Sequence, residues 1–111
     1  MPVACHIMQV CDGAGVCGLG GPPVTAEFVT NSEDVSGLRL AYDGVAAPEF
    51  GRIGSTRFMT FVGSIRSGDE EITHTVVVTN IWVWSVVTRT HDNQRVEMRF
   101  LDCDFPTGSL Y

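Results

Sequence analysis

The segment CDGAGVCGLGGPP, residues 11–23, contains the residues with the clearest potential for chemistry. Gly13, Gly15 and Gly18 have the G-x-G-x-x-G spacing of loops that hold a dinucleotide pyrophosphate. Such a loop needs a helix directly after it, because the helix N-terminus supplies backbone N–H groups to the phosphates. The sequence continues as LGGPPVT, whose glycines, prolines and β-branched residues oppose a helix. We therefore expect no nucleotide site in this loop.

The cysteines are the next candidates, and they are Cys5, Cys11, Cys17 and Cys103. Cys5, Cys11 and Cys17 recur every six residues with His6 beside the first, a spacing unlike the paired knuckles of structural zinc sites. On a regular strand, Cys5 and Cys11 would face the same side as small buried hydrophobes. The sequence therefore favours reduced structural thiols, with no metal and no cofactor. Two alternatives remain open: a disulfide that closes the Cys11–Cys17 loop or includes Cys103, and a metal site built from Cys5, His6, Cys11 and Cys17.

The other polar residues form no catalytic arrangement. His74 lies in a segment rich in Val and Thr, His91 lies in an expected turn, and no serine has the G-x-S-x-G context of a nucleophile. The acids at 69–71, 102 and 104 are typical of solvated loops and strand ends. All seven basic residues are arginine, and without lysine the chain can form no Schiff base and no P-loop contact to phosphate. We predict that the protein is not an enzyme.

Charge and hydropathy exclude further classes of function. The formal net charge is −6, so nucleic acid and anionic membrane surfaces would be repelled. The N-terminal residues lack the basic and apolar regions of a secretory signal. No apolar run approaches the roughly 20 residues of a membrane-spanning helix. We expect a protein synthesised in the cytoplasm without a signal peptide, with neither nucleic acid nor membrane as a partner.

Alternating apolar and polar residues predict strands along most of the chain. Residues 23–30 and 37–44 alternate in this way, and residues 57–65 are apolar at both parities. Residues 95–103 alternate most cleanly. There we expect Val96, Met98 and Phe100 to face the core and Arg95, Glu97 and Arg99 to face the solvent.

The segment 71–90 is rich in Val, Thr, Ile and Trp but is too long for one strand. We therefore place a break near Thr79 and Asn80 and a hairpin turn at 91–94. The prediction is one antiparallel all-β domain over residues 1–111, a sandwich or small barrel of about 6–8 strands with long Gly-rich loops. Residues 1–22 form its N-terminal strand and Gly/Cys-rich loop, and residues 104–111 form a C-terminal tail.

Several apolar residues are candidates for contact with a partner. Trp82 and Trp84 share one face of their strand, either in the core or as an exposed aromatic surface for a protein or a sugar. The loop 42–54, which includes Phe50, and the tail, which ends in Leu110 and Tyr111, are apolar for exposed segments. These features indicate contact with another subunit.

The function that this sequence favours is structural. We expect a non-enzymatic interaction module that self-associates or joins a larger assembly, with a virion component such as a capsid decoration or tail protein as one example. The alternative is a small binding protein that uses Trp82 and Trp84 for a carbohydrate, or the N-terminal Cys/His cluster for a metal.

Overall fold

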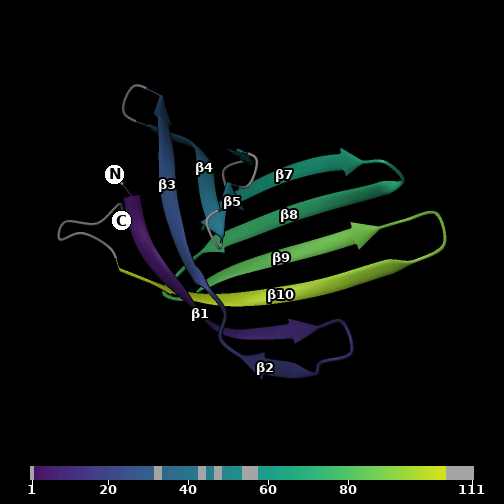
Figure 1. The fold of residues 1–111 in the computed structure, drawn as a ribbon. Helices are drawn as coiled ribbons and strands as arrows, with labels where there is room; N and C mark the ends of the chain where they lie inside the picture. The colour runs from purple at the N-terminus through teal and green to yellow at the C-terminus, as the bar shows by residue number, and fades with distance from the viewer. Residues whose placement is uncertain (1, 32–33, 43–44, 47–48, 54–57, 105–111) are drawn as a thin grey trace.

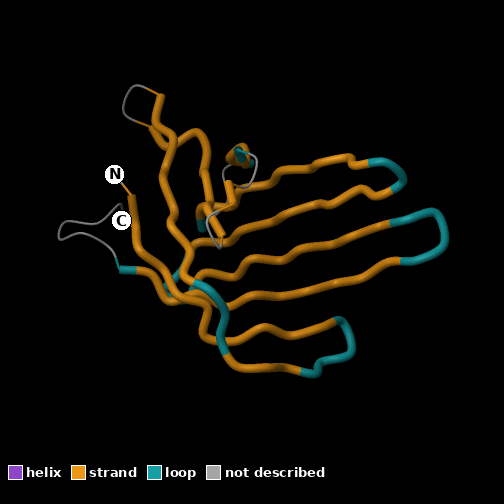
Figure 2. Tube along the Cα trace, in the orientation of Figure 1, coloured by secondary structure: helices purple, strands orange, loops and turns teal. Residues whose placement is uncertain are grey.

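Strands provide all the regular secondary structure of the computed structural model, which describes residues 2–31, 34–42, 45–46, 49–53 and 58–104 (Figure 2). In chain order they are β1 (Pro2–Asp12), β2 (Cys17–Leu19), β3 (Pro23–Asn31), β4 (Asp34–Tyr42), β5 (Val45–Ala46), β6 (Phe50–Arg52), β7 (Met59–Ser67), β8 (Glu70–Val78), β9 (Trp82–Arg89) and β10 (Gln94–Cys103). No helix capable of crossing a bilayer occurs within these ranges.

Eight of the strands form a closed antiparallel barrel. Their order is β1-β3-β4-β6-β7-β8-β9-β10, and β10 pairs back onto β1. The short strands β2 and β5 lie outside this ring and pair with β1 and β4. The prediction of an antiparallel all-β fold is confirmed, in its barrel form.

The strands on one side of the barrel extend further than those on the other side. Strands β7–β10 run side by side and extend past β3 and β4, and the β1–β2 hairpin extends in the same direction beside β10 (Figure 1). The break predicted near Thr79 and Asn80 and the predicted hairpin turn are both confirmed. Strand β8 ends at Val78 and β9 begins at Trp82, and the β9–β10 turn is closed by a 2.8 Å hydrogen bond from Thr90 N–H to the Asn93 carbonyl.

Large apolar side chains from every wall of the barrel fill its core. The largest that are fully buried are Trp82, Trp84, Phe50 and Phe61, and burying a side chain of this kind stabilises the fold by about 2–3 kcal/mol. Gly63 makes room for one of them, because a Cβ at this position would lie 2.4 Å from Cδ1 of Phe50. The alternation predicted in residues 23–30 and 37–44 is confirmed, because Val24, Ala26, Leu38 and Leu40 are buried while Thr25 and Arg39 are exposed.

The orientation predicted for β10 is wrong. Leu101 is buried beside Trp82, and Arg99 pairs with Trp84, so the odd-numbered residues of β10 face inward. Arg95, Glu97 and Arg99 therefore lie on the inner face, and Val96, Met98 and Phe100 lie on the outer face. The predicted alternation of β10 is present, but its charged face is the inner face and not the solvent-facing one.

The expectation of reduced cysteines is also corrected. Disulfides join Cys5 to Cys103 and Cys11 to Cys17, each between residues directly opposite in paired strands. A bulge between Ile7 and Gln9 shifts the register of β1. Inward-facing side chains therefore have odd numbers before the bulge and even numbers after it. Cys5 accordingly faces inward, while Cys11 lies opposite outward-facing Met98. A bulge of this kind breaks the shared parity that a regular strand would give.

The disulfides differ in the length of chain that they close, and this predicts unequal effects on stability. The Cys5–Cys103 link spans 98 residues and the Cys11–Cys17 link spans 6. On chain-entropy grounds, Cys5→Ala/Cys103→Ala should lower the free energy of unfolding by about 4.7 kcal/mol, and Cys11→Ala/Cys17→Ala by about 2 kcal/mol. Urea unfolding of both double variants measures the difference, and equal losses would contradict this account. Alkylation of the denatured, unreduced wild-type protein should label no cysteine.

Candidate functional site

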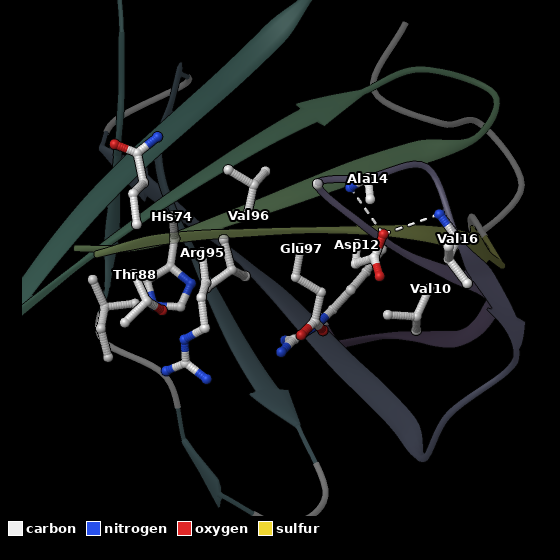
Figure 3. Close-up of a pocket in the computed structure, with 14 residues that line it drawn as sticks. Val10, Asp12, Ala14, Val16, His74, Thr88, Arg95, Val96 and Glu97 are labelled. Atoms are coloured by element: carbon white, nitrogen blue, oxygen red, sulfur yellow. Dashed lines mark hydrogen bonds and ion pairs between the residues drawn. The ribbon is translucent and has the colours of Figure 1, made fainter. Parts of the chain in front are cut away.

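A cavity of about 1010 Å³ opens on the inner side of the extended strands. Its walls come from the β1–β2 hairpin and from β8, β9 and β10. Val10, Asp12 and Val16 lie on one side of it, and His74 and Thr88 lie on the other (Figure 3). Barrel mouths are common places for small-molecule sites, so this cavity is the candidate site.

The glycine-rich segment forms one wall of the cavity. It was expected to be a Gly/Cys-rich loop, but it folds as a hairpin of β1 and β2. Oδ1 of Asp12 accepts hydrogen bonds from the N–H groups of Ala14 (3.0 Å) and Val16 (2.9 Å), and Gly15 has a φ of 86°, which favours glycine. Together with the Cys11–Cys17 disulfide, these contacts hold Asp12 and Val16 beside the cavity.

Arg99 forms part of the cavity floor. Its guanidinium carbon lies 4.6 Å from the ring centroid of Tyr42 and 4.3 Å from that of Trp84. Its Nε donates a 2.6 Å hydrogen bond to Oε1 of Glu97. The side chain is only 14% exposed. Cation–π contacts and the carboxylate together explain why a cation is stable on this inner face.

His74 lies on the floor beside Arg99. Its Nδ1 accepts a 3.1 Å hydrogen bond from Nε1 of Trp84, and its ring stacks on Phe50 at a centroid distance of 5.1 Å. An indole nitrogen can only donate, so Nδ1 carries no proton and the neutral ring carries its proton on Nε2. Burial, and to a lesser extent the positive charge of Arg99, lower the pKa of His74 below 6.5.

The suggested metal ligands do not come together in the structure. Cys5, Cys11 and Cys17 are all in disulfides, so none of them has a thiolate to offer a metal. His6 is exposed, and its Nε2 lies 3.9 Å from Oδ2 of Asp102. Across the part of the chain that the structure describes, no group of three or more His, Cys, Asp or Glu side chains could hold a metal ion.

The aromatic residues suggested for partner contact are in the core. Trp82, Trp84 and Phe50 are 0–2% exposed, so they form no aromatic surface for a protein or a sugar. Trp82 and Trp84 are buried because they lie on the inner face of β9, while Val83 and Val87 lie on its outer face. Leu110 and Tyr111 lie outside the described residues.

The outer face of β7–β10 is a second candidate surface, which was not predicted from the sequence. Register pairs place its residues in three rows of four, and none of the twelve is charged. The rows are Thr60–Val77–Val83–Phe100, Val62–Thr75–Ser85–Met98 and Ser64–Thr73–Val87–Val96. We call these twelve residues the uncharged face. The apolar residues at both parities of 57–65 were the signal that could have indicated it.

His74 predicts a particular dependence of stability on pH. Its pKa in the folded protein is below that of the unfolded chain, so its contribution is complete above about pH 6.5 and is lost as the pH falls from there through the folded-state pKa. Replacing it as His74→Asn keeps an acceptor for Trp84 but removes the titrating group. The variant should show a flatter change in urea midpoint from about pH 7.5 to about pH 5.

The matched control for this measurement is His91→Asn. The His91 side chain is 95% exposed, and its replacement should leave the pH dependence of the wild-type protein unchanged. Asp12 and Glu97 also line the cavity, but both are unchanged in the two variants, so the comparison isolates His74. An identical pH dependence in wild-type and His74→Asn proteins would refute the assignment.

Comparison with known proteins adds no function to this geometry. No protein-family model, no curated protein and no solved structure matches the chain. The residues, contacts and charges of the barrel are therefore the basis for assigning its function.

Proposed function

We propose that this protein is a non-enzymatic interaction module that self-associates through the uncharged face of β7–β10. The observation that carries the proposal is the composition of this face: seven apolar and five hydroxyl side chains with no charge among them. Eleven of the twelve are half-buried and Ser64 is exposed. The solvent-exposed face of an antiparallel sheet normally carries polar and charged residues. The composition of the uncharged face therefore favours contact with protein.

The opposite wall of the same barrel provides an internal comparison. On the outer face of β3 and β4, Arg39 lies 3.5 Å from Glu27 and 3.1 Å from Glu49. These side chains are about half exposed, as expected for a solvated face. The chain as a whole is charged, with a formal net charge of −6. The lack of charged residues at the twelve positions on β7–β10 is therefore specific to this face.

Two exposed apolar residues extend the uncharged face at one end. Phe58 and Ile81, just before β7 and β9, are 50% and 45% exposed. With strands about 4.8 Å apart and rows about 7 Å apart, the extended face covers roughly 500 Å². A stable interface buries about 800 Å² on each partner. The proposed contact is therefore reversible and depends on protein concentration.

The charges at the two ends of the face suit a second copy of this chain. Arg66, Glu71 and Arg89 form the next row at one end, while Asp102 lies opposite His6 at the other. A two-fold axis perpendicular to the strands would place the arginine-rich end of one copy over the Asp102 end of the other. Such pairing favours one register of association.

The disulfides are consistent with work outside a reducing cytosol. Disulfides persist in oxidising surroundings, among them virion and cell surfaces, and this protein has two. A subunit of an extracellular or virion assembly, such as the virion component expected from the sequence, would use the uncharged face to join its neighbours.

Placing a charge in the middle of the face tests the proposal. Thr75 is in the central row of the uncharged face, so Thr75→Arg would have to bury an unpaired guanidinium in the contact. Sedimentation equilibrium from about 10 µM to about 1 mM should show wild-type dimers, and at least a tenfold weaker association for Thr75→Arg.

Thr25→Arg is the matched control, because Thr25 is an exposed threonine on the outer face of β3. It makes the same change in side chain and net charge, and it should associate like the wild-type protein. A wild-type monomer throughout the concentration range would refute the proposal, as would equal weakening by both substitutions.

A further inference from the structure

The cavity contains hydrogen-bond donors that the uncharged face and its proposed contact do not use. Arg99 uses Nε for Glu97, while neither of its terminal Nη groups donates to a residue that the structure describes. His74 is 9% exposed, and its Nε2–H likewise has no acceptor within the described ranges. Both side chains line the cavity, so its floor presents several N–H donors.

The remainder of the lining limits the ligand. Val10, Val16, Ile72 and Val86 supply aliphatic surface on different walls. Asp12 and Glu97 are directly opposite each other across the β1–β10 pair, and their carboxylates offset the guanidinium charges of Arg95 and Arg99 in the lining. Without a net positive charge, the lining disfavours an anion with two charges. A ligand for this cavity therefore combines one negative charge with an apolar body.

We propose that the cavity binds an organic monocarboxylate with an apolar body, whose carboxylate accepts hydrogen bonds from the Nη groups of Arg99 and from Nε2–H of His74. A guanidinium presents parallel N–H groups that match the two oxygens of a carboxylate. The aliphatic residues of the lining then surround the body of the ligand.

The contacts beneath these two donors prepare them for a ligand. Tyr42 and Trp84 fix the plane of the Arg99 guanidinium, and Trp84 also fixes the tautomer of His74 through the bond to Nδ1. Donors that are already oriented lose little conformational entropy on binding. The same indole therefore links both donors and reports on ligand that binds above them.

Titration calorimetry with octanoate and with octanamide tests the proposal. The two probes share their chain and shape, but only octanoate is charged. The Thr75→Arg protein is used throughout, so that self-association does not contribute to the heats. Octanoate should bind at least about tenfold more tightly than octanamide, with a change in tryptophan fluorescence. Acetate, which lacks the apolar body, should bind more weakly than octanoate.

Two substitutions in the cavity should act in opposite directions. Arg99→Lys keeps the charge but loses the two parallel donors, and it should weaken octanoate binding by about tenfold or more. Glu97→Gln removes the carboxylate that competes for Arg99, and it should tighten octanoate binding several-fold. Arg66→Lys, on the outer face, is the control and should change neither affinity.

Three results would overturn the proposal. These are no binding of octanoate up to about 10 mM, equal affinity for octanoate and octanamide, and no tightening by Glu97→Gln. The last result remains decisive if Arg99→Lys fails to fold, because Glu97 is 42% exposed and its replacement by Gln conserves shape. None of these results bears on the uncharged face, so the two proposals fail or succeed separately.

Discussion

The antiparallel pairing of β1 with β10 is the contact on which the rest of this barrel depends. It joins the first and last described strands, and without it both would be open edges that invite other chains. Closing so long a chain segment has a large entropic cost, which the Cys5–Cys103 disulfide reduces by limiting the unfolded ensemble. The β1–β10 register also fixes which residues of β10 face inward, and hence the chemistry of both surfaces.

The bulge in β1 extends this control to the cavity. Before the bulge, Cys5 and Ile7 face the core. After it, Val10 and Asp12 face the cavity, and Cys11 is left outside to pair with Cys17. A single shift in register therefore lets one strand close the barrel, form a wall of the cavity and carry a disulfide on its outer face.

The sequence was informative about strands and less so about their faces. Alternation and turn residues located most strands and the break near Thr79, because these signals are local. Which side chains of β10 face inward could not be predicted from local signals. Their orientation depends on Tyr42 and Trp84, on strands β4 and β9, which stabilise Arg99 inside the barrel. The pairing of Cys103 with Cys5 could not be fixed for the same reason, since these residues meet only when the barrel closes, whereas the Cys11–Cys17 disulfide was one of the open alternatives. The shared parity of Trp82 and Trp84 gave no sign of which face of their strand was buried.

One choice of register creates both proposed sites. If β10 were turned over, Val96, Met98 and Phe100 would fill the space beneath the β1–β2 hairpin, while Arg95, Glu97 and Arg99 would lie among the outer threonines and valines of β7–β9. The donors of the cavity and the uncharged face would disappear together. The unexpected orientation of β10 is retained by specific contacts, namely the disulfide at Cys103, the buried Leu101 and the aromatic rings under Arg99. An arrangement that places charges inside and apolar residues outside opposes the usual preference for burial, and it is intelligible if both the charged interior and the apolar exterior meet a partner.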